Sequence, residues 1–155
     1  MEGTSIAATN AFSIEVLVVN GRWTYRSADG ANHISTVNAD SAWHQLTVSH
    51  YAARGETLFF VDGKLAGRAT ERLEPKRFTL GGTVAADYKD LMVFRAALNA
   101  DEAAALNSGM LLQASLEVFA PLTDTVFKEG SSVENRAQSM SVVKVGNGQI
   151  THLAQ

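Results

Sequence analysis

Cysteine is absent from this chain of 155 residues. That absence excludes disulfide scaffolds, thiolate zinc sites and cysteine nucleophiles, although it leaves the cellular compartment open. Excess charge is also lacking, because the formal net charge is only −3 and no basic cluster is present. Without such a cluster we expect no nucleic-acid partner and no anionic membrane surface as a partner.

Long apolar runs are missing as well. No stretch approaches the ~18 consecutive apolar residues of a membrane-spanning helix, so we expect no membrane insertion. Residues 1–10 lack the basic start and apolar centre of a signal peptide. The chain is therefore either cytoplasmic or a mature or excised domain whose targeting segment has been removed. We favour the second interpretation, with the chain as part of a larger extracellular, periplasmic or cell-surface protein.

The composition is that of an ordinary globular domain, with 46% apolar and 19% charged residues. A chain of this length suits one domain, and we expect residues 1–155 to form a single unit. No internal repeat or low-complexity linker divides it.

Short alternating segments joined by tight turns dominate the first half of the chain. Asn20-Gly21 and Asp62-Gly63 each lie between two strand-like runs, and both pairs favour type I′ hairpins because both turn positions need positive φ. Regularly spaced short strands of this kind predict an all-β antiparallel sandwich. The strands are expected at 11–19, 22–26, 33–37, 46–51, 58–61, 78–80, 89–95, 114–122, 133–145 and 150–153.

One helix is expected near residues 100–107. Asn99 is an N-cap residue with Glu102 three positions later, which is the capping-box pattern. Alanines and Leu106 continue the helix, and Asn107 or Gly109 can end it. Such a short helix should lie across one end of the sandwich.

Two segments resemble the laminin-G-like, concanavalin A-like jelly rolls. In the first, Trp43-His44 leads into an alternating strand that ends at Tyr51, and Phe60-Val61-Asp62-Gly63-Lys64 then forms a turn. In the second, Asp90 opens a strand ending at Phe94, before Ala97-Leu98 and the helix cap. The resemblance covers roughly residues 9–107 and implies a jelly-roll β-sandwich with one short helix.

The chain departs from that family at its beginning. Residues 1–112 match the family core, but the usual first strands are missing, and residues 116–122 and 133–137 look like that absent beginning. A circular permutation, a fragment spanning two domains, and a C-terminal extension would each explain this order. We expect residues 113–155 to pack back onto the same sandwich and supply the missing strands.

Catalytic patterns are lacking. The Glu-x-Asp-x-x-Glu strand that glycoside hydrolases of this fold share does not occur, nor does a Gly-x-Ser-x-Gly nucleophile segment. We therefore expect no enzyme activity, with a glycoside hydrolase-related domain as the most distant alternative. The acidic residues that stand alone in turns or at strand edges include Glu15, Glu56, Glu71, Glu74 and Glu117.

No cofactor is expected, and calcium is the one candidate metal, because many relatives of the fold use it. Asp87 and Asp90 are the candidate ligands, although no Asp-rich loop surrounds them. His44 and His50 share a strand face with Leu46 and are expected to flank the core as structural residues, not as zinc ligands.

Carbohydrate binding is the function that the resemblance and the residues jointly allow. Sugar sites use an aromatic platform with planar polar side chains beside it. Trp23 and Tyr25 share one strand face, and Trp43, Gln45 and Tyr51 belong to a second aromatic and polar row. The candidate residues are Trp23, Tyr25, Trp43, Gln45 and Tyr51. The competing interpretation is that these rings complete packing at strand ends.

We therefore expect a non-catalytic recognition module that takes a glycan or polysaccharide. A protein–protein interaction domain or a structural spacer is the alternative. Because a fold does not determine a function, the assignment rests largely on the resemblance.

Overall fold

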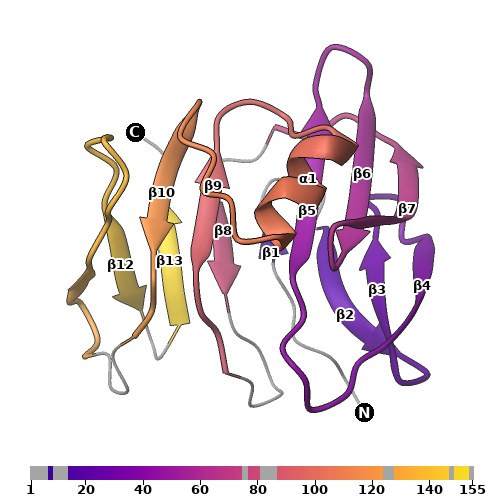
Figure 1. The fold of residues 1–155 in the computed structure, drawn as a ribbon, viewed down its shortest axis with the longest axis horizontal. Coiled ribbons are helices and arrows are strands. Elements are labelled where there is room, and N and C mark those ends of the chain that lie inside the picture. The colour runs from indigo at the N-terminus through magenta and orange to yellow at the C-terminus, as the bar shows by residue number, and fades with distance from the viewer. Residues whose placement is uncertain are drawn as a thin grey trace.

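The computed structural model describes residues 7–8, 14–74, 77–80, 87–123, 128–146 and 149–153. In these residues the chain forms thirteen β-strands and one α-helix (Figure 1). They are β1 (Ala7–Ala8), β2 (Glu15–Val19), β3 (Arg22–Arg26), β4 (Asn32–Asn38), β5 (Leu46–Tyr51), β6 (Glu56–Val61), β7 (Lys64–Thr70), β8 (Arg77–Leu80), β9 (Leu91–Phe94), α1 (Ala100–Asn107), β10 (Leu116–Ala120), β11 (Ser132–Val133), β12 (Val143–Gly146) and β13 (Gln149–Leu153).

The strands pair into four antiparallel sheets. Their orders are β2–β3–β4, β5–β6–β7, β10–β9 and β1–β8–β13–β12–β11. Figure 1 shows β5–β7 and β9–β10 as a front layer, with β2–β4, β8, β12 and β13 behind it. The molecule is therefore all-β and sandwich-like with one short helix, which confirms the predicted class at this level.

Both predicted hairpin turns are present. Asn20 and Gly21 have φ of 50° and 75°, and Asp62 and Gly63 have φ of 51° and 73°. Positive φ at both positions is the type I′ geometry, whose twist matches that of the flanking strands. The first turn joins β2 to β3, and the second joins β6 to β7.

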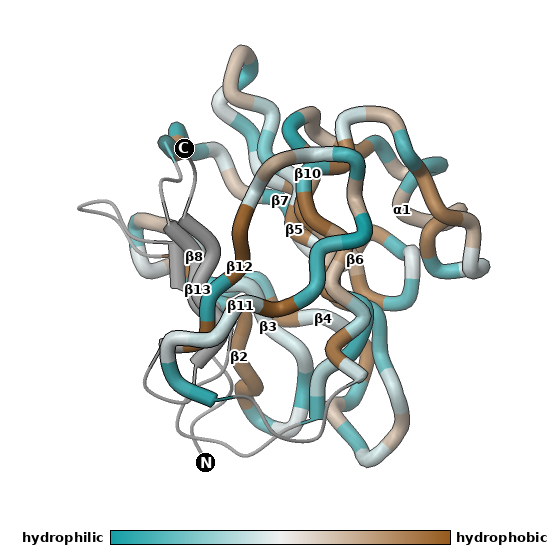
Figure 2. The backbone as a smooth tube through the Cα atoms, turned by 90° about the vertical axis from the view of Figure 1, so that its left-hand side faces the viewer, coloured by the Kyte–Doolittle hydropathy of each residue, from teal (hydrophilic) through white to brown (hydrophobic). Residues whose placement is uncertain are grey.

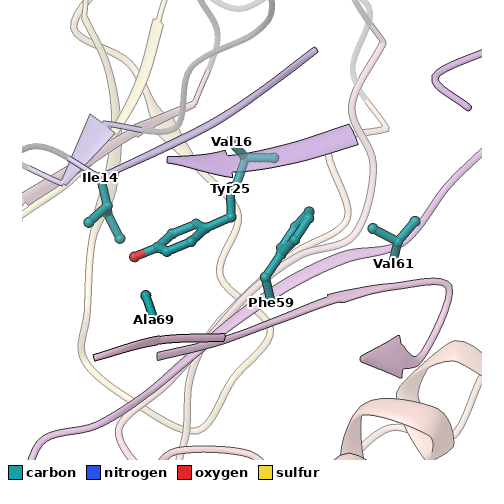
Figure 3. Close-up of a cluster of buried hydrophobic side chains, with 6 residues drawn as sticks. All are labelled: Ile14, Val16, Tyr25, Phe59, Val61 and Ala69. Carbon is teal, nitrogen blue, oxygen red and sulfur yellow. The ribbon is translucent and has the colours of Figure 1, made fainter. Parts of the chain in front are cut away.

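The main core lies between the β2–β3–β4 sheet and the β5–β6–β7 sheet (Figure 3). Tyr25 from β3 stacks on Phe59 from β6, with ring centroids 6.0 Å apart and an angle of 28° between the planes. Alternate residues of β3, β5 and β6 point inward, as the period of two requires. The buried cluster comprises Ile14, Val16, Tyr25, Phe59, Val61 and Ala69.

The helix covers the other face of β6. Leu58 and Phe60 point away from the main core and pack against Ala103, and Figure 2 shows α1 on the side of β6 away from β2–β4. The capping box is present, because Asn99 Oδ1 accepts from the Glu102 N–H at 3.0 Å while Glu102 accepts from the Asn99 N–H at 2.7 Å. The predicted helix is thus confirmed.

A buried serine joins the helix connection to the sheet. Ser49 Oγ donates to the Leu98 carbonyl and accepts from the Leu98 N–H, each at 2.7 Å. These bonds pair a backbone segment that leaves β9 before it reaches the helix.

Throughout the described parts of the chain, no helix has both the length and the apolar character needed to cross a membrane.

The C-terminal third pairs with strands from the middle of the chain. β10 pairs with β9, and β13 lies between β8 and β12. A second buried cluster joins β10 to β11 and β12. It comprises Val118, Ala120, Val133, Val143 and Val145.

Residues 133–145 are expected as one loose β segment, but only their ends are strands. Side-chain bonds and one backbone bond, from the Arg136 N–H to the Phe119 carbonyl at 2.8 Å, join the intervening loop to β10. Asn135 Oδ1 accepts from the Phe119 N–H at 2.9 Å, and Asn135 Nδ2 donates to the Glu117 carbonyl at 3.2 Å. This loop covers the free edge of β10, which would otherwise expose unpaired backbone groups. Residues 147–148, between the strands expected at 133–145 and 150–153, lie outside the described residues.

Candidate functional site

The most exposed aromatic candidate lies on the connection between β4 and β5, residues 39–45, here called the Trp43 loop. Backbone hydrogen bonds tie both ends of the loop to the two hairpin turns. The Ala39 N–H donates to the Gly21 carbonyl at 2.8 Å, and the Asp62 N–H donates to the Gln45 carbonyl at 2.9 Å. The loop therefore sits where the two facing sheets end.

Trp43 projects from this loop with 58% of its surface exposed. The Lys89 ammonium lies 4.6 Å from the centroid of its ring, within cation–π range. Lys89 is itself exposed and belongs to the segment that leads into β9. An exposed indole beside a hydrogen-bond donor is the combination that can stack on a sugar ring and bond its hydroxyls.

His44, the next residue, is held between two carboxylates. Its Nδ1 lies 2.8 Å from Asp62 Oδ2, and its Nε2 lies 3.2 Å from Asp40 Oδ1. The same carboxylates bond the backbone of the loop, since Asp62 Oδ1 accepts from the Gln45 N–H at 3.0 Å and Asp40 Oδ1 accepts from the Ala42 N–H at 2.7 Å. Asp40 and Asp62 thus hold the loop on either side of Trp43.

The surroundings of His44 and of Asp40 each favour the charged form of the side chain. The hydrogen bond to Asp62, aided by the one to Asp40, raises the pKa of His44 above its usual value, against the opposing effect of burial. The Ala42 N–H, followed by His44, lowers the pKa of Asp40. A hydrogen bond that favours the charged form stabilises it, so the bridge contains an imidazolium over a raised pH range.

Trp23 and Tyr25 both face inward. Trp23 packs against the main core and meets the His44 ring edge-on, with centroids 6.0 Å apart. Tyr25 is fully buried, and its hydroxyl donates to Glu71. Burial, reinforced by that hydrogen bond, raises the pKa of Tyr25. Their shared strand face was predicted, but it is the core face, and the buried Tyr25 ring offers no surface to a ligand.

Gln45 immediately precedes β5 and Tyr51 ends it, so the two residues are roughly 20 Å apart along a strand by its rise per residue. Gln45 lies beside the Trp43 loop, and its Oε1 is buried without a hydrogen-bond partner among the described residues. Tyr51 packs against the Leu58 and Phe60 cluster, with the Arg54 guanidinium 5.3 Å from its ring. Trp43 and Gln45 therefore share the loop, and Trp23 meets it through the His44 ring, while Tyr25 and Tyr51 lie elsewhere.

The candidate calcium ligands are both exposed in the segment before β9. Asp90 has a φ of 54°, and its N–H donates to the Pro121 carbonyl at 3.1 Å. Within the residues that the structure describes, no group of three or more His, Asp or Glu side chains could hold a metal ion.

Three residues of this site were not identified from the sequence, namely Asp40, Asp62 and Lys89. Asp40 precedes His44 by four residues, and this spacing could have suggested their pairing. Asp62 was assigned only to the hairpin turn, and Lys89 has no local pattern that connects it to Trp43. The expectation that His44 flanks the core agrees with its edge contact to Trp23.

His50 lies on the face of β5 opposite to Ser49 and packs toward the main core. Its Nδ1 lies 3.0 Å from Thr57 Oγ1, and its Nε2 accepts from the Leu73 N–H at 3.2 Å. An accepting Nε2 requires the neutral ring, with the remaining proton on Nδ1. Burial accordingly lowers the pKa of His50.

We expect the free energy of unfolding to fall less steeply at acidic pH in His50→Gln than in the wild type. The unfolded chain binds a proton on His50 near pH ~6.5, whereas the folded chain binds it only at lower pH. The free energy of unfolding therefore falls as pH drops from ~6.5 through the lowered pKa, and this slope should shrink in the variant. Urea unfolding at several pH values measures it.

His44→Gln is the matched control, because the raised pKa of His44 gives a contribution of opposite sign. That contribution is present below pH ~6.5 and is lost as pH rises through the folded value. Identical pH slopes for the wild type and His50→Gln would contradict the assignment of a buried neutral ring.

No family model, no curated protein and no solved structure matches this chain.

Proposed function

We propose that the chain is a non-catalytic recognition module that binds carbohydrate through the Trp43 loop. The single observation that carries this proposal is the exposed Trp43 ring, set on a loop whose backbone is anchored by two carboxylates. Anchoring limits the conformational entropy lost on binding, which is the main advantage of a preformed site. The resemblance to laminin-G-like and concanavalin A-like domains supports the same assignment.

Lys89 and the polar groups around Trp43 would supply the hydrogen bonds. The Lys89 ammonium has three donors and lies over one face of the indole, so a sugar would stack on the other face and meet Lys89 at the margin of the ring. The finer architecture that we propose is a concanavalin A-like jelly roll, supported by the two facing layers of antiparallel sheets. The setting that we propose is a larger extracytoplasmic protein, which rests on the resemblance alone.

Titration with a panel of soluble polysaccharides, followed by tryptophan fluorescence, tests the proposal. The chain has only two tryptophans, and Trp23 is half-buried, so a bound sugar should change mainly the Trp43 signal. We expect Trp43→Ala to weaken binding about 30-fold, because an aromatic anchor contributes ~2 kcal/mol. Leu65→Ala is the control, since Leu65 is 51% exposed and belongs to β7, outside the Trp43 loop.

Two outcomes would contradict the proposal. Unchanged affinity in Trp43→Ala would mean that the binding site lies elsewhere. Release of reducing ends from any polysaccharide would show that the chain is catalytic. The alternative of a protein partner is favoured by apolar exposure at Ile34 on β4 and Leu65 on β7. No response to a broad polysaccharide panel would favour that alternative.

A further inference from the structure

His44 closes the Trp43 loop upon itself. Asp40 and His44 are four residues apart, and their side chains meet at 3.2 Å, so Trp43 lies inside the segment that this contact closes. The contact between His44 and Asp62 at 2.8 Å ties the same segment to the β6–β7 turn. One imidazole therefore contacts a carboxylate within the loop and a carboxylate of the β6–β7 turn.

The two contacts together require a proton. Both ring nitrogens face carboxylate oxygens, which accept hydrogen bonds but cannot donate them when ionised. The imidazolium has two N–H donors and satisfies both carboxylates, whereas the neutral ring has one donor and leaves a lone pair against an oxygen. Loss of the proton thus breaks one of the two contacts.

Among the described residues, the charged groups that face His44 are the carboxylates of Asp40 and Asp62. Asp40 faces it from the loop and Asp62 faces it from the β6–β7 turn, while β3 contributes the uncharged Trp23 ring. Its side chain is only 11% exposed, so solvent replaces a lost partner poorly. His44 therefore keeps both contacts only while its ring carries the second proton.

We propose that the Asp40–His44–Asp62 bridge is a proton-dependent latch that holds Trp43 in its binding position. This inference rests on the proposed function where it concerns carbohydrate, and on the geometry of the bridge where it concerns the loop. The latch is closed at mildly acidic pH and opens as His44 loses its proton. Carbohydrate affinity therefore falls as the pH rises and His44 loses its proton.

The experiment follows His44 and Trp43 separately by NMR between about pH 5.5 and 8.5, a range that brackets the usual titration of histidine. The indole N–H signal of Trp43 is assigned by its loss in Trp43→Phe. In the wild type we expect this signal to shift with the same midpoint as the His44 ring. In His44→Gln the pH-dependent shift should disappear, and in His50→Gln, the matched control, it should remain.

Polysaccharide binding is measured over the same pH range. We expect the affinity of the wild type to fall about fivefold as His44 deprotonates, the equivalent of one hydrogen bond. Asp40→Asn is a milder second variant, because Asp40 is exposed and its loss removes one carboxylate without removing the ring. It should lower the midpoint of the Trp43 shift, which keeps the test valid if His44→Gln does not fold.

The outcomes separate the two proposals. A Trp43 signal that stays constant while His44 titrates overturns the latch, as does equal pH dependence of binding in the wild type and His44→Gln. Binding that is constant with pH leaves the carbohydrate function and removes the latch. A Trp43 shift that follows His44 without binding to any polysaccharide keeps the latch and removes the carbohydrate function.

Discussion

Gly63→Ala should destabilise the fold by about 3 kcal/mol. The substitution has two costs, since Gly63 has a φ of 73° and an added Cβ would lie 2.9 Å from both Ala104 Cα and Asn107 Cβ. A left-handed alanine costs ~1–2 kcal/mol, and overpacking against a fixed neighbour costs ~1–3 kcal/mol more. The free energy of unfolding in urea at 25 °C measures the sum.

Gly21→Ala is the matched control for this prediction. Gly21 occupies the same position of the other type I′ turn, with a φ of 75°, but nothing lies within 4 Å of its added Cβ. It should therefore cost only the conformational part, ~1–2 kcal/mol. Equal losses in the two variants would mean that α1 does not pack against the β6–β7 turn as closely as the structure has it.

Phe59→Ala should cost about 3–5 kcal/mol, the usual loss when a fully buried phenylalanine is truncated. Phe59 is 0% exposed, and its ring stacks on Tyr25 between the two facing sheets. Natural domains have only ~5–15 kcal/mol of total stability, so this variant should lose a large share of it. Denaturant unfolding with an unchanged m-value would confirm that the loss is one of packing.

Leu65→Ala, at an exposed position of the neighbouring strand β7, is the comparison for Phe59→Ala. Surface substitutions of this kind usually change stability by no more than ~0.5 kcal/mol. A small effect at both positions would contradict the placement of the main core between the β2–β3–β4 and β5–β6–β7 sheets.

Much of the local structure could be predicted from short patterns. The Asn20-Gly21 and Asp62-Gly63 pairs predicted two hairpins, and Asn99 with Glu102 predicted the start of α1. Each of these features depends on φ preferences or hydrogen bonds within about four residues. The alternation of β3 likewise predicted that Trp23 and Tyr25 share a face, which the structure confirms.

Alternation did not reveal which face of β3 meets the core. Its period of two defines two faces, and only the sheet packed against β3 decides which one is buried. Tyr25 became a core residue because Phe59, 34 positions later, lies opposite its ring. The same limitation affected residues 134–142, whose side-chain bonds to β10 have no signature in the local pattern.

The candidate site shows most clearly which features depend on neighbouring residues and which depend on the packed sheets. Residue types along the chain specified the turns, the helix cap and the alternation of the strands, because those depend on neighbours a few bonds away. The meeting of Trp43 with Lys89, and of His44 with Asp62, required the packed sheets to bring distant segments to one end of the molecule. Such contacts join residues 46 and 18 positions apart, and their geometry exists only once the intervening strands have paired.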